Sequence, residues 1–163
     1  MATSLESSVA GRVFRPGDAG YAEALAIFNS DVHHTPELVV EAASPADVLA
    51  AMRYAADRGL PAHVLSAGHA PARPISSGLV VALRRMDKVA VDGPRRIATV
   101  GGGARAGAVV AAAAALGVAP VTGSSPLVGM AGLLLGGGFG PLARSHGFAS
   151  DYLLGATVVT GTA

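Results

Sequence analysis

The sequence has no Cys and no Trp, and it carries little charge. Without Cys among its 163 residues, disulfides, thiolate zinc sites and Cys nucleophiles are excluded. Its aromatic residues are three Tyr and four Phe, which argues against a platform for stacking nucleic-acid bases. Charged residues make up 14% of the chain and the net charge is +1, so no basic field indicates nucleic-acid binding. Hydrophobic residues reach 51%, which excludes intrinsic disorder. The length of 163 residues allows one ordinary domain or two very small ones.

One long stretch, residues 106–143, holds no Asp, Glu, Lys or Arg and therefore resembles a membrane segment. Nine Gly and three Pro interrupt it, and its longest apolar run, residues 108–116, has nine residues. Such a run is too short to cross a bilayer. The start of the chain also lacks the basic and apolar regions of a signal peptide. We therefore expect a cytoplasmic protein that does not bind a membrane.

Short apolar runs between turn signals predict a mixture of helices and strands. Strands are predicted at 38–40, 61–65, 79–83, 86–92, 97–100 and 156–160. Helices are predicted at 45–58, 105–116 and 141–146. The first helix has the clearest start, because Ser44 is a good N-cap, Pro45 fits the first turn and Asp47 closes a capping box. The pattern predicts an α+β or α/β fold.

Glycine is concentrated in one part of the chain, with 12 of the 22 Gly in residues 101–140. Glycine at this density suits a backbone that approaches a bulky polar ligand closely, and backbone N–H groups can hold phosphates without charged side chains. The pattern Gly101-x-Gly103-x-x-Ala106 matches a dinucleotide fingerprint, but no acidic residue lies between Asp92 and Asp151 to bind the ribose. A Rossmann site and a glycine-rich turn before a helix are the two interpretations, and the second is favoured.

The histidines offer one candidate site. The five His have no metal-ligand spacing, and no P-loop, nucleophile elbow or zinc-protease motif occurs, so no metal site is expected. His33 and His34 are interpreted as surface residues. His69 follows a predicted strand within a loop of small residues, Ser66-Ala67-Gly68-His69-Ala70.

These pieces occur in a characteristic order: SAGHA, then GLVVALRRMDKVAVD, then a glycine-rich segment that includes GSSPLVGMAGLLLGGGFG. The order resembles the FAD-linked oxidases of the vanillyl-alcohol oxidase and p-cresol methylhydroxylase (PCMH) superfamily, and looks closest to the bacterial berberine-bridge-like oxidoreductases. The resemblance covers about residues 35–163. It implies an α+β, PCMH-type FAD-binding domain with two small α/β subdomains, incomplete before the substrate domain, after a lead segment at 1–34.

The resemblance also implies a site for FAD, held on one side by the His69 loop and on the other by the loop from Gly123. In the family a His at the position of His69 often bonds to the flavin 8α-methyl. Members with two covalent links carry Cys where this chain has Ser125, while Ala67 replaces a frequent Gly and Ala70 a frequent Ser, so FAD that stays free beside His69 is the alternative. The implied cofactor-binding residues are Ser66, Ala67, Gly68, His69, Ala70, Gly123, Ser124, Ser125, Val128, Gly129, Gly132, Gly136 and Val159.

The implied function is oxidation of a small organic substrate by hydride transfer to FAD. No catalytic residue can be assigned, because in the family these residues lie beyond the part that this chain resembles. Two alternatives stay open: a non-catalytic module that binds flavin or another ligand, and one chain of a split enzyme. A homodimer or a partner chain that supplies the substrate domain is expected for either form.

Overall fold

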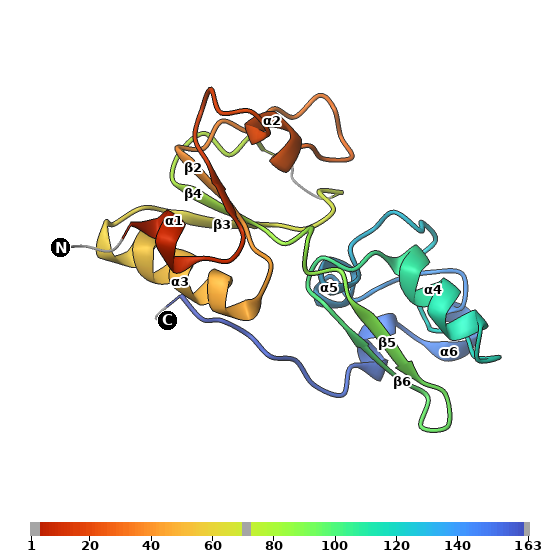
Figure 1. The fold of residues 1–163 in the computed structure, drawn as a ribbon. Helices are drawn as coiled ribbons and strands as arrows, with labels where there is room; N and C mark the ends of the chain where they lie inside the picture. Colours follow the sequence, from red (N-terminus) through yellow and green to blue (C-terminus); the bar gives the residue numbers. More distant parts are fainter. Residues whose placement is uncertain (1–3, 70–72, 162–163) are drawn as a thin grey trace. The chain divides into compact units, whose positions relative to one another are not determined.

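The computed structural model describes residues 4–69 and 73–161 (Figure 1). The chain forms two compact units. The first contains Met1–Arg85 together with Thr157–Ala163, and the second contains Met86–Ala156. The predicted α+β class is confirmed, since both units combine helices with a β-sheet.

The first unit is built on a four-stranded sheet in the order β1-β2-β4-β3. Both β2 and β3 run parallel to β4, whereas β1 pairs with β2 in the antiparallel sense. Residues 38–40 of β2 and all of β4 are buried apolar runs, since helices or loops cover both faces of these two central strands. The strands are β1 (Arg12–Phe14), β2 (Leu38–Glu41), β3 (Ala62–Leu65) and β4 (Leu79–Ala82).

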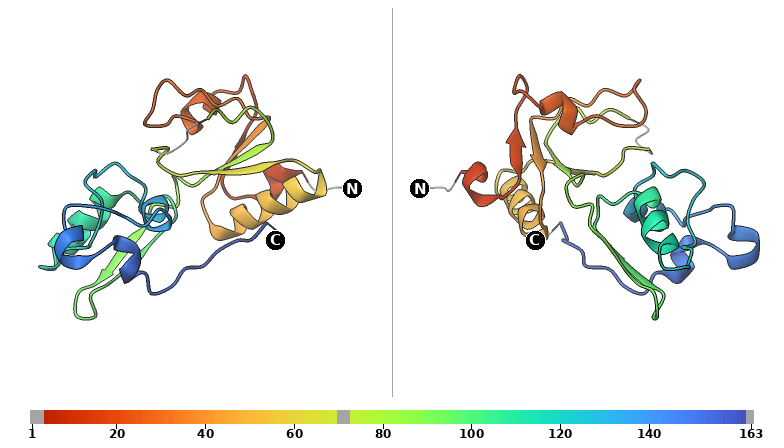
Figure 2. Two further views of the ribbon diagram at one scale, coloured as in Figure 1. Left: turned by 180° about the vertical axis from the view of Figure 1, so that it is seen from behind. Right: turned by 45° about the vertical axis from the view of Figure 1, so that its right-hand side comes forward.

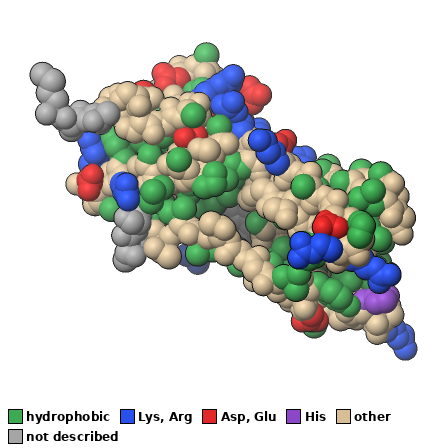
Figure 3. Space-filling view, turned by 60° about the horizontal axis from the view of Figure 1, so that its bottom comes forward, with side chains coloured by type: hydrophobic (Ala, Val, Ile, Leu, Met, Phe, Trp, Pro, Cys, Tyr) green, Lys and Arg blue, Asp and Glu red, His purple; other side chains and the backbone are tan. Residues whose placement is uncertain are grey.

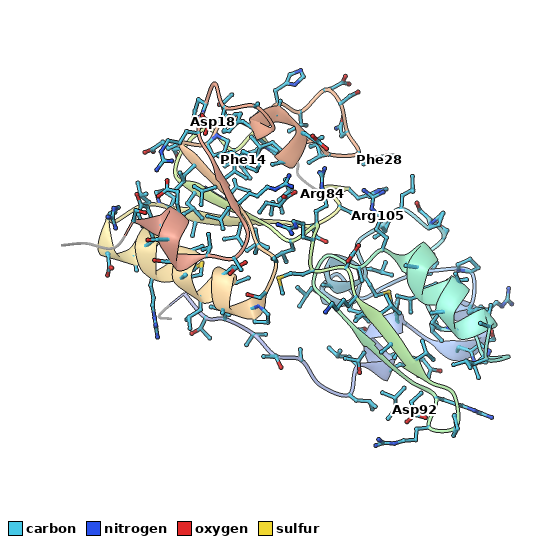
Figure 4. The ribbon with its side chains drawn as sticks, viewed as in Figure 1. Phe14, Asp18, Phe28, Arg84, Asp92 and Arg105 are labelled. Carbon is cyan, nitrogen blue, oxygen red and sulfur yellow. The ribbon has the colours of Figure 1, made fainter. Side chains whose placement is uncertain are left out.

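Two layers enclose this sheet, as the views in Figure 2 show. On one face lie α1 (Leu5–Ser8) and α3 (Pro45–Asp57), and on the other lies α2 (Tyr21–Ala24). The core on the α2 side consists of Ala24, Leu25, Val39, Leu65, Val80 and Ala82, with Phe14, Tyr21, Ile27 and Ile75 packed against it. Arg84 donates from its guanidinium to the carbonyls of Glu23 and Ala26, at 2.9 and 2.6 Å, and so holds the end of α2 (Figure 4).

The start of α3 follows the prediction in most respects. Ser44 is the N-cap and accepts from Asp47 N–H at 3.3 Å, with Pro45 in the first turn. The prediction of a capping box is wrong in its second bond, because the Asp47 carboxylate does not accept from the Ser44 N–H. It instead accepts from the N–H groups of Ala10, Gly11 and Ala43 at 2.8–3.0 Å. Asp47 therefore fastens the N-terminal segment to α3.

The second unit contains an antiparallel hairpin and four short helical segments. The hairpin turns at residues 93–96, as predicted from Gly93-Pro94, and Asp92 lies at this end (Figure 4). Its small core joins Ala106, Val109 and Met130 to partly buried Val89, Val100, Leu133 and Leu134. The elements are β5 (Val89–Asp92), β6 (Ile97–Val100), α4 (Ala106–Ala114), α5 (Met130–Leu135), α6 (Ala143–His146) and a 3-10 helix (Ala149–Tyr152).

The sequence prediction fails in three places. Residues 156–160 are extended but form no strand, because no described strand pairs with them, and Val158 is 73% exposed. Helix α5 lies within a segment whose glycines gave no helical signal. The elements α1, β1 and α2 come from a region with weak patterning. No helix in residues 4–69 or 73–161 is long and apolar enough to cross a membrane.

Candidate functional site

The residues implied to bind a cofactor fall into both units. Residues 66–69 follow β3 in the first unit, and Val159 is also grouped with that unit. Ala70 lies outside the described residues. The remaining positions, from Gly123 to Gly136, lie in the second unit.

His69 is held in a defined orientation after β3. Gly68 has a φ of +68°, and a Cβ at this position would overlap the Cβ and Cγ2 of Ile27. The His69 ring stacks on Phe28, with centroids 4.1 Å apart and planes 15° from parallel. Its Nε2 atom is buried and has no hydrogen-bond partner among the described residues. A buried imidazole nitrogen without a partner is costly unless a ligand uses it, and both His69 Nε2 and His34 Nε2 are of this kind. Of the two, His69 lies in the loop that the resemblance assigns to the cofactor, so it is the candidate ligand-binding side chain.

Sequence reasoning missed two side chains near this loop, Phe28 and His34. The interpretation of His34 as a surface residue is wrong: it is 7% exposed, whereas His33 is exposed as expected. The reason is an alternation of exposed and buried residues over 33–38 that leads into β2. This period of two is a signal that the sequence contains and that could have identified His34 as buried.

His34 is bonded within the fold. Its Nδ1 accepts from the Ile75 N–H at 3.0 Å, while the Thr35 N–H donates to the Ile75 carbonyl at 2.7 Å. Burial lowers the pKa of His34 below its ordinary value, and the nearby His63 lowers it further.

In the second unit, residues 126–128 lie across the start of α4. Their carbonyls accept from Ala106 N–H and Gly107 N–H, each at 2.9 Å, and Met130 N–H donates to Ala104 at 2.8 Å. These bonds occupy N–H groups that a dinucleotide pyrophosphate would need at this helix. The segment Gly101–Ala106 is therefore a glycine-rich turn before a helix, as favoured, and not a Rossmann site.

The other implied residues of this unit surround a turn and a hollow. The Ser125 hydroxyl oxygen accepts from Leu127 N–H at 3.3 Å and shapes the turn. Ser124 lines a mainly apolar hollow of about 530 Å³, together with Phe139, Arg144 and Phe148. Gly129 immediately precedes α5 and Gly136 ends it. A Cβ at Gly132 would meet no described heavy atom within 4 Å, so this glycine faces open space.

Comparison with known proteins agrees with this geometry. The model of the FAD binding domain family matches residues 36–163. The chain is 40% identical, over 95% of its length, to (R)-6-hydroxynicotine oxidase of Paenarthrobacter nicotinovorans, of which it covers 34%. It is 34% identical, over 83% of its length, to glucooligosaccharide oxidase of Sarocladium strictum, of which it covers 28%. The chain thus spans about a third of the length of these relatives.

Solved structures share the fold. A crystal structure of 6-hydroxy-D-nicotine oxidase from Arthrobacter nicotinovorans superposes with a TM-score of 0.91 at 41% identity, over 99% of this chain and 36% of that one. Glucooligosaccharide oxidase from Acremonium strictum, which carries 6-S-cysteinyl, 8α-N1-histidyl FAD, superposes with a TM-score of 0.82 at 29% identity, over 98% of this chain and 35% of that one. The chain therefore belongs to the FAD-binding domain family of FAD-linked oxidases, within the vanillyl-alcohol oxidase and p-cresol methylhydroxylase superfamily.

Proposed function

We propose that this chain is the FAD-binding part of an oxidoreductase that oxidises a small organic substrate, and that His69 is its flavin attachment residue. The observation that carries the proposal is the buried Nε2 of His69, which has no partner among the described residues. The relatives named above, which are flavin-linked oxidases, support it through the shared family.

Each unit, taken by itself, has residues that suit a flavin. In the first, Gly68 and the Phe28 ring fix the His69 imidazole in one orientation. In the second, the open space at Gly132 lets a ligand approach the backbone, and Ser124 presents a hydroxyl beside the apolar hollow. The chain has no Cys, so a second, cysteinyl link is impossible.

FAD, when bound, supplies the capacity to accept a hydride from a substrate carbon. The chain's own contribution is to bind and orient the cofactor. Phe28 stacks on one face of the His69 ring, and the buried Nε2 is not engaged by any described residue, so it is available for a bond to the ligand. A residue held this way before the ligand arrives loses little conformational entropy on binding.

The test is an absorption spectrum of the purified chain with FAD, recorded before and after acid precipitation. Flavin absorbance that stays with the precipitated protein is expected for the wild-type chain and absent for His69→Ala. The matched control is His33→Ala, which removes an exposed imidazole and leaves the attached flavin unchanged. Acid-stable flavin in the His69→Ala variant would show that another residue carries the link. Flavin that leaves with the supernatant in every variant would establish non-covalent binding.

A second candidate, one chain of an enzyme that needs a partner polypeptide, is supported by exposed apolar side chains in the second unit. Leu135, Phe139 and Leu154 are 87%, 74% and 80% exposed. On the face that Figure 3 shows, hydrophobic side chains reach the surface and charges of both signs are scattered among them. Exposed apolar groups of this kind mark surfaces that other polypeptides cover. Light scattering decides this candidate: a stable monomer at micromolar concentration contradicts it, and a dimer or captured partner supports it.

A further inference from the structure

Several contacts with one constant offset in sequence join the segment before β2 to the loop that carries His69. We call residues 27–37 the strap. Partners 41 positions apart meet along it, and the parallel ladder of β2 and β4 continues at the same offset. The meeting pairs are Ile27 with Gly68, Phe28 with His69, His34 with Ile75, and Glu37 with Gly78. The loop that carries His69 therefore packs against the strap.

His34 makes the polar contact that fixes the far end of this packing. Its Nδ1 accepts from Ile75 N–H at 3.0 Å, and Thr35 N–H donates to the Ile75 carbonyl at 2.7 Å, so both polar groups of the Ile75 backbone are bound by the strap. Ile75 also packs on the core cluster of the first unit, as does Ile27. One cluster thus supports the strap and the loop together.

The bond to Ile75 requires a neutral imidazole. Because Nδ1 accepts, the ring carries its proton on Nε2, which is buried and has no partner in the described part of the chain. A second proton turns both ring nitrogens into donors, and Nδ1 then faces the Ile75 N–H without accepting from it. A charged ring at a site 7% exposed is also poorly solvated. Protonation of His34 and closure of this contact are mutually exclusive.

Other titratable groups lie on the elements around His34, and their titration must be distinguished from that of His34. These are Tyr21 on α2, His63 on β3, Glu37 on the strap and Arg73 before Ile75. His63 acts on His34 through its charge. The Tyr21 hydroxyl donates to the Pro36 carbonyl at 2.6 Å, and the Glu37 carboxylate accepts from Gly78 N–H.

We propose that His34 is a positioning residue for His69, because it holds the loop against the strap through its hydrogen bond to Ile75. We call this hydrogen bond the clamp, and proton uptake by His34 opens it. The proposal rests on the proposed function in that His69 is taken to contact flavin. It predicts that closure of the contact between His34 and Ile75, and with it the formation of the flavin link at His69, declines as the solution becomes acidic.

The first test measures hydrogen exchange of the Ile75 amide by NMR in the full chain, expressed as protection relative to an unstructured amide at the same pH. The ordinary His pKa of 6.5 sets the scale. Each pH unit below it favours the open, protonated form by up to about tenfold, so protection falls by up to about tenfold between pH 7.5 and 5.5.

Two variants identify His34 as the group that titrates. In His34→Asn the side-chain oxygen occupies the position of Nδ1 and cannot be protonated, so Ile75 stays protected across the whole range. In His34→Leu the bulk remains but the acceptor is lost, so protection is already low at pH 7.5. The controls His33→Asn and His63→Gln retain the decline seen in the wild-type chain. A decline in His34→Asn equal to that of the wild type overturns the proposal, as does full protection of Ile75 in His34→Leu.

The second test measures how much acid-stable flavin forms when the flavin-free chain is incubated with FAD over the same pH range. Wild type is expected to form less as the pH falls from 7.5 to 5.5, and His34→Asn to form the same amount throughout. If the wild-type chain takes up no FAD while Ile75 follows the expected pH dependence, the proposed function fails and the clamp stands. If wild type and His34→Leu form acid-stable flavin at equal rates at pH 7.5, the clamp does not position His69 and the proposal is overturned.

Discussion

Two glycines with the same backbone conformation allow a sharp test of how the His69 loop is packed. Gly59 and Gly68 have φ values of +62° and +68°. A Cβ at Gly59 would meet no described heavy atom within 4 Å, whereas a Cβ at Gly68 would overlap Ile27. Both lie in the first unit, so Gly59→Ala and Gly68→Ala differ in this contact and not in backbone conformation.

The expected loss of stability in each variant follows from two costs, the backbone conformation and the contact with Ile27. The left-handed conformation costs about 1–2 kcal/mol for a residue with a Cβ, and both variants incur it. Overpacking against Ile27 adds about 1–3 kcal/mol in Gly68→Ala alone. At about 3 °C per kcal/mol for a chain of this size, Gly68→Ala should unfold roughly 3–9 °C below Gly59→Ala.

Thermal unfolding followed by circular dichroism gives the comparison, with flavin retention as a second measurement on the same samples. Gly68→Ala should also lose flavin, since Ile27 and Gly68 belong to the packing of the His69 loop against the strap, whereas Gly59→Ala should keep it. Equal unfolding temperatures for the two variants would refute the packing of Ile27 against Gly68.

Three further predictions concern other parts of the molecule. Asp47→Ala removes three backbone hydrogen bonds and should destabilise the fold by about 3 kcal/mol at pH 7, measured by urea unfolding. Burial raises the pKa of Asp47, but the hydrogen bonds lower it by more, so the pKa in the folded chain lies below 3.8. The stability difference from wild type should therefore shrink as the pH falls below 3.8. Gly132→Leu places a side chain in open space on α5 and should leave the unfolding temperature unchanged or raised while FAD binding, measured by fluorescence titration, weakens at least tenfold. Phe28→Leu removes the ring stacked on His69 and should slow the formation of acid-stable flavin without changing the unfolding temperature by more than about 3 °C.

The elements that the sequence predicted are those with strong local signals. The strands around Val39 and Val80 are continuous apolar runs, and α3 has a cap and a proline at its start. The segment around Val159 also has a strand-like pattern, yet it forms no strand. A strand exists through hydrogen bonds to a neighbour, and local residue preference does not supply that neighbour.

The candidate site could be predicted only in part for a similar reason. His69 and the glycines around it lie in contiguous motifs, so the resemblance located them. Phe28 and His34 act through contacts with residues 41 positions away in the chain, and a single sequence contains no direct record of such pairing. The alternation of buried and exposed residues at 33–38 would have placed His34 inside, but not its bond to Ile75.

The constant offset between the strap and the His69 loop has a consequence for insertions and deletions. Adding one residue between His34 and Glu37 would leave Glu37 matched to Gly78 only if the contact between His34 and Ile75 were broken. A change of one residue at 35–36 is therefore harmful alone and tolerated when residues 76–77 change by the same number. The two segments must keep matching lengths, so natural or engineered variants of this domain should lengthen or shorten them together.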